Sequence, residues 1–335
     1  MEIKEAIKKV ISKEDLTADE MADVMNEIMA GETTSAQKGG FLVGLKEKGE
    51  TSEELLGAAR ALRSHTVKVN IKDNKHLIDT CGTGGDGGKT FNVSTAVAII
   101  AASGGVKVAK HGNRAVSSKS GSLDVLSALG IKTDYSSEES AKIIEEKGMS
   151  FLLATTYNSG MKNVGKERIE LGTRTIFNML GPLLNPAPLT GQLMGVYDGS
   201  LIRTVGEVLL DLGLDRAMVV HGDDGLDEIT TTTTSKICEV KNGKIVSYTF
   251  DPQEYGFKLC KIDDIAGGEP AENAQIIKRI LNGEKGPKRD IVVVNAAAAL
   301  YVGKIVDSIE EGIKMAINLI DSGKALRKYN ELKEA

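Results

Sequence analysis

The chain has 335 residues, of which 41% are hydrophobic and 27% charged, and its formal net charge is -5. This length allows two domains with a large core, and the negative charge argues against a nucleic-acid-binding surface. No apolar run reaches the roughly 18 residues of a membrane span, and the charged, amphipathic N-terminus is unlike a signal peptide. The three cysteines show no CxxC spacing. We therefore expect a cytoplasmic protein with free thiols whose partners are neither nucleic acids nor membranes.

Residues 1–65 predict helices only. An apolar stripe marks the first helix and consists of Ile3, Ile7, Val10 and Ile11. Start signals for the next three helices are the capping box Thr17–Glu20, a cap at Ser35 and the capping box Thr51–Glu54. Gly31 and Gly49 are the matching stop signals.

After residue 70 the pattern changes to alternating strands and helices. Apolar runs predict strands at Leu77–Thr80, Val106–Ala109, Ser150–Ala154, Leu193–Tyr197, Ala217–His221 and Ile291–Asn295. Helical patterns follow most of them, at Ser94–Ala102, Ser122–Leu129, Glu138–Lys147, Leu201–Leu212, Ala271–Leu281 and Ser308–Ser322. Crossovers of this length imply a largely parallel sheet covered on both faces. Asn242-Gly243 predicts an antiparallel hairpin between Lys236–Val240 and Ile245–Phe250.

One helical segment interrupts this alternation at residues 162–185. We expect it to pack back onto the N-terminal helices. The predicted fold is α/β, with a small all-helical domain of residues 1–70 completed by 163–186. A large α/β domain of residues 71–162 and 187–335 carries a central, mostly parallel sheet flanked by helices. A ligand is expected in a cleft between the two domains.

A glycine-rich turn follows the first predicted strand, and residues 82–87 match GxGxxG. A dinucleotide site would need an acidic residue at the end of the second strand, where this chain has Lys110. NAD is therefore disfavoured, and the absence of GxxxxGK[ST] leaves a P-loop unsupported. A plain strand-to-helix turn is the alternative. The polar residues nearby favour an anion site instead, and they are Asp86, Asn92, Ser94 and Thr95.

The second predicted strand opens into a basic loop, residues 110–118, that carries Lys110, Arg114 and two serines. Gly112 allows close backbone approach, and the helix that begins at Ser122 offers N–H groups to an anion. This loop is either a phosphate site or an ordinary solvated basic loop.

Acidic residues follow the strand at 217–221. Carboxylates at a strand end suit Mg²⁺ held together with waters and substrate phosphates. Two pairs compete for this role, Asp223-Asp224 and Asp227-Glu228, and their spacing does not choose between them. An acidic surface loop is the alternative. The three loops together indicate a Mg²⁺-assisted transfer involving a phosphorylated sugar or nucleotide.

At these residues the chain closely resembles the anthranilate phosphoribosyltransferases of tryptophan biosynthesis, over nearly its whole length. The motifs that carry the resemblance are Gly82-Thr-Gly-Gly-Asp86, Asn92-Val-Ser-Thr95, Lys110-His-Gly-Asn-Arg114 with Ser117-Ser118, Arg174-Thr-Ile-Phe-Asn178, Gly181-Pro-Leu-Leu-Asn-Pro186 and Asp224-Gly-Leu-Asp-Glu228. The resemblance implies Mg²⁺-dependent transfer of phosphoribosyl from phosphoribosyl pyrophosphate to anthranilate, releasing pyrophosphate. It also implies a homodimer formed through the helical domains.

The resemblance implies a role for particular residues. Catalysis is assigned to Lys110, Asn113 and Arg168, and anthranilate binding to Gly82, Asn113 and Arg168. Two Mg²⁺ ions per monomer are expected, with Ser94, Asp227 and Glu228 as ligands. Phosphoribosyl pyrophosphate is expected to contact Gly82, Gly85, Asp86, Thr90, Asn92, Val93, Ser94, Thr95, Lys110, His111, Gly112, Asn113, Arg114, Ala115, Val116, Ser117, Ser118 and Ser122.

Three places depart from the family pattern. Asn158 stands where the family usually has histidine, and Thr155 where it has proline. Leu123 replaces a smaller residue, and the run Tyr301-Val-Gly-Lys304 is shortened. The alternative functions are a nucleoside phosphorylase of the same fold and a non-enzymatic nucleic-acid-binding relative. The first would lack the Asp227-Glu228 pair, and the net charge opposes the second.

Overall fold

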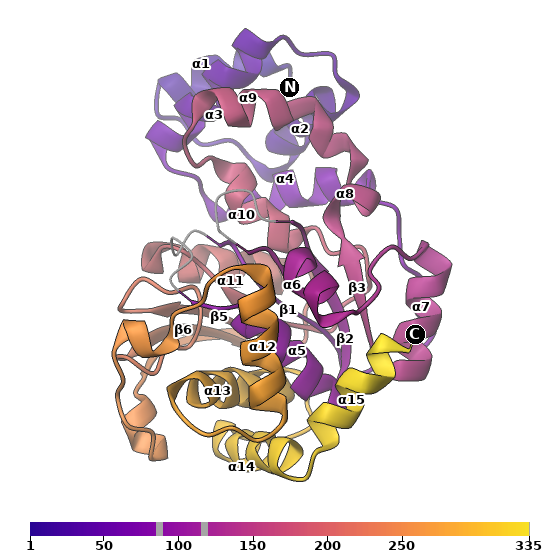
Figure 1. Ribbon diagram of the computed structural model, residues 1–335. Coiled ribbons are helices and arrows are strands. Elements are labelled where there is room, and N and C mark those ends of the chain that lie inside the picture. The colour runs from indigo at the N-terminus through magenta and orange to yellow at the C-terminus, as the bar shows by residue number, and fades with distance from the viewer. Residues whose placement is uncertain (85–89, 115–119, 335) are drawn as a thin grey trace.

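The fold is described from a computed structural model that defines residues 1–84, 90–114 and 120–334 (Figure 1). The strands are β1 (Leu77–Gly82), β2 (Lys107–Gly112), β3 (Met149–Leu153), β4 (Gly191–Gly195), β5 (Arg216–Gly222), β6 (Ser235–Lys241) and β7 (Lys244–Phe250). The helices are α1 (Ile3–Ile11), α2 (Ala18–Ala30), α3 (Ser35–Lys48), α4 (Ser52–Ser64), α5 (Val93–Ser103), α6 (Ser122–Leu129), α7 (Ser137–Lys147), α8 (Ala154–Tyr157), α9 (Lys162–Leu171), α10 (Ile176–Leu183), α11 (Ile202–Asp211), α12 (Pro270–Leu281), α13 (Pro287–Val302), α14 (Ile309–Asp321) and α15 (Lys324–Lys333). Short 3₁₀ turns are η1 (Ser159–Met161), η2 (Gly199–Leu201), η3 (Pro252–Tyr255) and η4 (Ile262–Ile265).

A small helical domain at the N-terminus stands above a larger α/β domain, as the sequence predicts (Figure 1). Both predicted capping boxes form, at Thr17–Glu20 and Thr51–Glu54. The third helix is capped by Thr34 rather than Ser35. The Thr34 hydroxyl accepts from the N–H of Gln37, and the Gln37 side-chain oxygen accepts from the N–H of Thr34. Helices α9 and α10 lie against α2, α3 and α4.

The stripe predicted on α1 is only partly buried. Ile3 and Val10 are buried, whereas Ile11 is 66% exposed. Ala6 is also buried and lies on the opposite side of Ile3 from Ile11. At about 100° per residue, the buried face is therefore centred away from Ile11, which remains on the surface.

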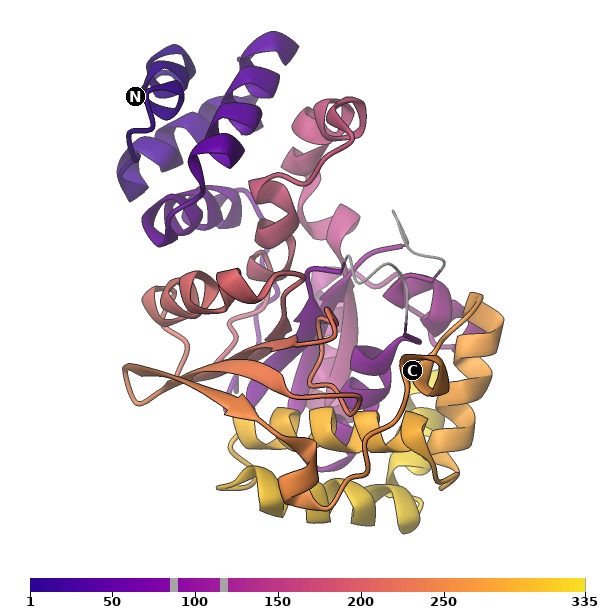
Figure 2. The ribbon, with the colours of Figure 1, turned by 90° about the vertical axis from the view of Figure 1, so that its left-hand side faces the viewer.

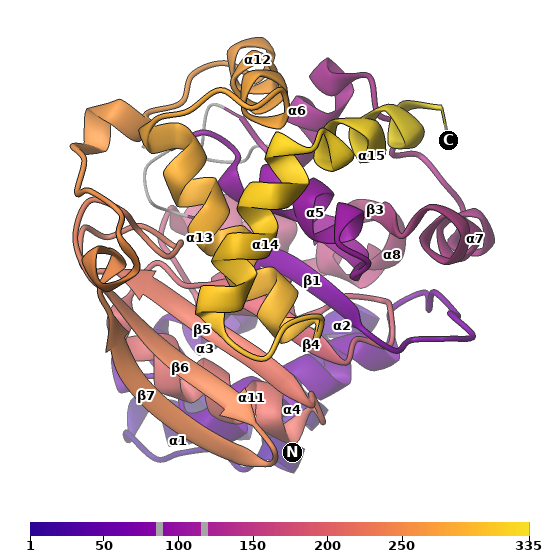
Figure 3. The same cartoon turned by 90° about the horizontal axis from the view of Figure 1, so that it is seen from below.

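One seven-stranded sheet forms the centre of the large domain, in the order β3-β2-β1-β4-β5-β6-β7. The first five strands in this order are parallel, and β6 and β7 are antiparallel additions. Asn242 and Gly243 have φ of 52° and 71°, so the predicted hairpin turn is confirmed. Neighbouring residues alternate between the faces: Met218 joins the core under α5, α13 and α14, and Val219 joins the core of α11 and the helical domain (Figures 2 and 3).

The predicted strand Ile291–Asn295 is wrong, because these residues lie inside helix α13. The helix is buried continuously from Ile291 to Val302, so its apolar residues show no helical periodicity, and a short apolar run of this kind also suits a buried strand. Pro287 at the first helical turn was the available signal for a helix. The sequence also left α15 unpredicted.

The order of the parallel strands creates a switch point between β1 and β4. From β1 the chain adds β2 and β3 on one side, then returns to add β4 and β5 on the other. Sheets of this kind bind ligands beside the carboxyl ends of the strands at such a point. The carboxyl ends of β1 and β4 are Gly82 and Gly195, which are paired in register.

Candidate active site

Asp227 lies directly over this glycine pair. Its carboxylate oxygen Oδ2 accepts a hydrogen bond of 2.8 Å from the N–H of Gly84. A Cβ placed on Gly82 would come within 2.3 Å of the same Oδ2, and one on Gly195 within 1.6 Å of the Asp227 backbone oxygen. Both strands must therefore end in glycine for this carboxylate to reach the switch point.

The other acidic pair is engaged within its own loop. Asp224 accepts from the hydroxyls of Thr230, at 2.6 Å, and Thr232, and from the N–H of Leu226 at 3.1 Å. Asp223 accepts from the hydroxyl of Thr234 at 2.5 Å. These bonds fold the loop between β5 and β6, and Asp227 is left facing the glycine-rich turn.

Lys110 is buried between β1 and the start of α5. Its ammonium is part of a side chain that is 1% exposed, and it donates to the Thr80 backbone oxygen and to the Ser94 hydroxyl at 3.2 Å. Burial lowers the pKa of Lys110, while the negative charges of Asp79 and Glu228 act in the opposite direction. The structure thus joins Lys110 to Ser94, and Glu228 is near enough for its charge to act on Lys110.

A buried polar cluster lies beneath this group. Asp79 accepts from the His111 N–H at 3.2 Å and from the Asn185 amide at 2.8 Å. Burial raises the pKa of Asp79 to about 6, against the attraction of Lys110. Burial lowers the pKa of His111 to about 4. His111 is therefore a neutral imidazole at physiological pH, on the strand end that carries Lys110.

Asn158 bonds to His111 and to two connections between the domains. Its side-chain nitrogen lies 3.1 Å from His111 Nε2 and 3.5 Å from the Leu184 oxygen, and its oxygen accepts from the Thr66 hydroxyl at 2.6 Å. Thr66 follows α4, Leu184 follows α10, and Asn158 itself lies between α8 and η1. All three places where the chain passes between the helical and α/β domains therefore meet at one amide.

The start of α5 is tied to a neighbouring loop and to α12. Asn92 accepts from the Ser120 hydroxyl at 3.0 Å and from the Asn273 amide at 3.1 Å. Thr90 forms an isolated bridge with Ala266. Val93 and Thr95, the other candidates here, are buried in the first turn of α5.

The loop after β2 is exposed where the structure describes it. The Asn113 oxygen accepts from the Leu123 N–H at 3.3 Å, and Arg114 pairs with Asp124 at 3.3 Å. Leu123 is 2% exposed and packs into the core, so this departure fills apolar space. Gly112 lies close to Ser122, since a Cβ on Gly112 would be 3.4 Å from Cβ of Ser122. The remaining candidates lie outside the described residues: Gly85, Asp86, Ala115, Val116, Ser117 and Ser118.

Arg168 lies on α9, where its guanidinium is 5.7 Å from the ring centre of Phe177 on α10. The neighbouring acids have other partners, Lys38 for Glu167 at 2.8 Å and Lys166 for Glu170 at 3.8 Å. Burial lowers the pKa of Arg168. Arg168 therefore belongs to the helices that pack with α2 and α3, whereas Lys110 lies on β2 and Asn113 directly follows it, in the α/β domain.

Sequence reasoning missed four residues that shape this site, Asp79, Gly195, Asn273 and Asn295. Asp79 and Gly195 lie within or at the end of predicted strands, so polar and glycine residues at those places were the available signal. Asn273 and Asn295 gave none, because their contacts lie 181 and 66 residues away in the chain.

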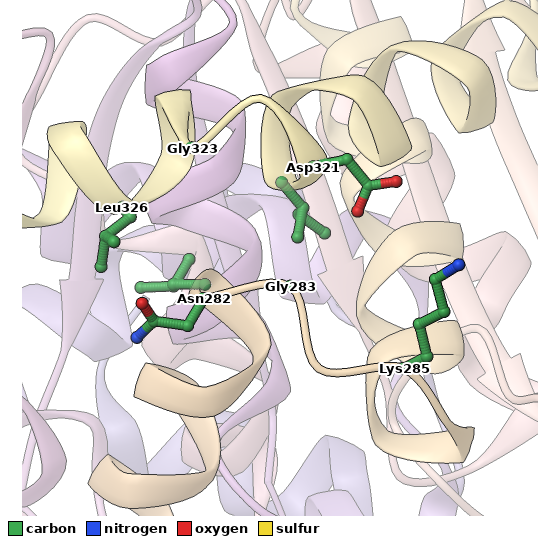
Figure 4. Close-up of a pocket in the computed structure, with 8 residues that line it drawn as sticks. Asn282, Gly283, Lys285, Asp321, Gly323 and Leu326 are labelled. Carbon is green, nitrogen blue, oxygen red and sulfur yellow. The ribbon is translucent and has the colours of Figure 1, made fainter.

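A cavity away from the switch point lies at the far end of α12. It measures about 370 Å³ and is lined by the C-terminal ends of α12 and α14 and the start of α15, including Gly283, Asp321 and Leu326 (Figure 4). Because Asn273 near the start of α12 contacts Asn92, this cavity is about one helix length, roughly 18 Å, from the candidate site. It plays no part in the chemistry considered below.

The donor set at the switch point fits Mg²⁺. Two carboxylates and a hydroxyl are hard oxygen ligands, and Mg²⁺ is usually bound through one or two carboxylates with waters and substrate phosphates. The described residues contain no group of three or more His, Cys, Asp or Glu that could hold a metal by themselves. The same part of the chain has no helix with the length and apolarity to cross a membrane.

Comparison with known proteins covers nearly the full chain. Residues 74–326 match a family model described as "Glycosyl transferase family, a/b domain", and residues 4–66 match its "helical bundle domain". An anthranilate phosphoribosyltransferase of Clostridium beijerinckii is 66% identical over 99% of this chain and 98% of its own, and one of a Thermoanaerobacter species is 58% identical over 99% and 98%.

Solved structures agree with these relatives. Anthranilate phosphoribosyltransferase from Thermus thermophilus superposes with a TM-score of 0.92 at 39% identity, covering 98% of both chains. The Saccharomyces cerevisiae enzyme in complex with PRPP and Mg superposes with a TM-score of 0.90 at 28% identity, covering 99% of this chain and 97% of the other. Identity of this extent, over both domains, shows that the chain belongs to the anthranilate phosphoribosyltransferase family.

Proposed function

We propose that this protein transfers the phosphoribosyl group of phosphoribosyl pyrophosphate to the amine of anthranilate. The C1–oxygen bond to pyrophosphate breaks, a C1–nitrogen bond forms, and the amine loses a proton. Full-length relatives with this name support the reaction over a nucleoside phosphorylase. The observation that carries it is the position of Asp227 over the glycine pair of β1 and β4, in the same sheet whose strand β2 carries Lys110, bonded to Ser94.

Asp227, Glu228 and Ser94 would hold Mg²⁺, and we propose two ions per monomer. Bound Mg²⁺ neutralises the charge that develops on departing pyrophosphate. Lys110 adds a fixed positive charge behind Ser94, in a buried setting where charge interactions are strong. No protein nucleophile is required, so correct positioning of the two substrates supplies much of the rate.

The phosphoribosyl pyrophosphate site proposed here follows the strand ends of the α/β domain. Its members in the described part of the chain are Gly82, Thr90, Asn92, Val93, Ser94, Thr95, Lys110, His111, Gly112, Asn113, Arg114 and Ser122. The positive end of the α5 dipole favours an anion at this turn, where the N–H groups of Val93 and Thr95 themselves donate to the backbone oxygens of Phe91 and Asn92. The proposed site also includes the candidate residues of the two loops that lie outside the described residues.

The acceptor site is proposed at Gly82, Asn113 and Arg168. A guanidinium can hold a carboxylate through two parallel hydrogen bonds. Contact with the Phe177 ring orients the Arg168 head group, and the other cations of α9 do not have this support. Anthranilate would therefore be held between the helical domain and the strand ends.

We also propose that residues 1–70 and 163–186 form the small domain, and that it mediates a homodimer in the cytoplasm. The packing of α9 and α10 against α2, α3 and α4 supports the boundaries. Exposed apolar residues on α1 and α3 support the dimer. The three free thiols suit a reducing compartment.

The test is release of pyrophosphate when the protein is mixed with Mg²⁺, phosphoribosyl pyrophosphate and anthranilate. We expect release that stops when any one component is omitted, together with an equal amount of phosphoribosylanthranilate. Nucleoside cleavage by inorganic phosphate, without pyrophosphate release, would identify a phosphorylase instead.

A further inference from the structure

A single asparagine interrupts the apolar interior of α13. Asn295 is 0% exposed, and its neighbours Val294 and Ala296 are also completely buried. A buried amide must find hydrogen-bond partners or cost stability. The bonds that Asn295 makes therefore indicate why this position is polar.

Two of the three bonds go to one residue. The Asn295 oxygen accepts from the backbone N–H of Ile229 at 3.0 Å, and its nitrogen donates to the Ile229 backbone oxygen at 2.8 Å. The third bond goes from the same nitrogen to the Ile291 oxygen, one turn earlier in α13. The side chain thus pairs with Ile229 much as a neighbouring strand would.

Ile229 immediately follows Glu228. The Asp227-Glu228 pair lies in the connection between β5 and β6, where no helix or strand holds the backbone. On one side of the pair, the bonds of Asp224 fold the loop. On the other side, Asn295 fixes the peptide that joins Glu228 to Ile229.

We propose that Asn295 is a positioning residue for the carboxylates of Asp227 and Glu228. The inference rests on the proposed function, since it concerns the Mg²⁺ ligands of that site. Residues that orient metal ligands without touching the metal typically change metal affinity by about 10- to 100-fold when replaced. Replacing Asn295 should therefore weaken metal binding, whereas replacing a core residue that only fills space should not.

The test uses Asn295→Leu, which keeps much of the side-chain volume, and Asn295→Ala, which adds no bulk and favours the helix. Val294→Ala is the matched control, because Val294 is buried beside Asn295 and makes no side-chain hydrogen bond to Ile229. Binding of Mn²⁺, used as a spectroscopic substitute for Mg²⁺, is measured by electron paramagnetic resonance with phosphoribosyl pyrophosphate present. Melting temperatures and amide exchange in the segment around Ile229 are measured in parallel.

We expect both Asn295 variants to bind Mn²⁺ at least about tenfold more weakly than the wild type, with faster amide exchange at Ile229. Val294→Ala should lose thermal stability and keep its Mn²⁺ affinity. Unchanged Mn²⁺ affinity in a folded Asn295→Ala or Asn295→Leu protein would overturn the proposal.

A double variant, Asp227→Asn with Glu228→Gln, separates this inference from the proposed function. Loss of Mn²⁺ binding in the double variant, with normal binding in the Asn295 variants, refutes only the positioning role. Normal binding in the double variant refutes the proposed metal site and the positioning role together.

Discussion

Two buried groups, Asp79 beneath the candidate site and His111 within it, have pKa values displaced in opposite directions. Asp79 is raised from 3.8 to about 6, so the folded state binds its proton more tightly and stability falls as pH rises through that window. His111 is lowered from 6.5 to about 4, so the unfolded state binds its proton more tightly and stability rises with pH. The two effects nearly cancel in the wild type.

Replacing either group should reveal the pH dependence of stability that is caused by the other. His111→Asn is expected to give a protein whose stability falls between pH 4 and 6, and Asp79→Asn one whose stability rises, each by on the order of 2–3 kcal/mol. Urea unfolding at several pH values measures the slopes, with the exposed His65→Asn as control. Slopes equal to that of the wild type would show that these groups are not titrating as described.

Gly195 permits a second prediction at the scale of one residue. Gly195→Ala puts a methyl group where the Asp227 backbone lies, whereas Gly191→Ala on the same strand would meet the backbone of Arg216 at 2.8 Å, at the opposite end. Both changes should destabilise the sheet, and Gly195→Ala alone should remove activity from the folded protein. Activity per folded molecule, determined beside a melting curve, distinguishes them. Equal activities would mean that Asp227 need not occupy its present position.

Arg168 tests the separation of the two substrate sites. Arg168→Ala leaves an anthranilate carboxylate without its partner, a loss of roughly 2–4 kcal/mol, or about 30- to 1000-fold in acceptor affinity. Phosphoribosyl pyrophosphate affinity should remain nearly unchanged. Lys166→Ala on the same helix is the control. Titration of each substrate decides the matter, and an equal loss for both would place Arg168 outside a dedicated acceptor site.

At the scale of elements, Asn158 joins the three connections between the domains. Asn158→Leu removes the bonds to Thr66 and His111, and we expect it to cost about 1–3 kcal/mol because buried polar groups lose their partners. Calorimetry should show a melting temperature lower by several degrees, and the exposed neighbour Ser159→Ala should show none of this change. A melting temperature of Asn158→Leu equal to that of the wild type would mean that other contacts hold the connections between the domains.

Elements with strong local signals could be predicted, and those defined by burial could not. Capping boxes mark where α2 and α4 begin, and β5 is an apolar run with clear ends. In α13 every face is buried, so the Ile291–Asn295 run carried no periodicity to distinguish helix from strand.

The candidate site divides in the same way. Residue types in the loops at 82–87, 110–118 and 223–228 indicate an anion and a cation, because local chemistry is visible in the sequence. The choice between the two acidic pairs depends on which carboxylate the threonines of the loop engage, and that depends on three-dimensional contacts. The role of Asn295 could not be predicted for the same reason, because its bonds to Ile229 are three-dimensional contacts.

At the scale of the whole molecule, the proposed dimer can be tested on its surface. Ile11 on α1 is 66% exposed and Val43 on α3 is 41% exposed. They flank Gly44, where a Cβ would be 3.7 Å from Ile11. Ile11→Glu with Val43→Glu should yield monomers in light scattering, because two charges would be buried in the interface without partners.

Val246→Glu is the control for this experiment, since Val246 is 57% exposed on the edge strand β7 of the other domain. It should leave the dimer intact. A wild-type protein that is monomeric, or a double variant that remains dimeric, would contradict an interface at this surface.

The way the helical domain is assembled also has a consequence for synthesis of the chain. Helices α1–α4 are translated first, but α9 and α10, which pack against them, follow roughly 100 residues later, or on the order of 10 s at typical rates of translation. During that interval the apolar side chains that the later segments cover have no permanent cover, including Met29, which packs beside Gly160 just before α9. Nascent chains paused before α9 has emerged should therefore bind chaperones at this surface of the helical domain, whereas the completed chain should not.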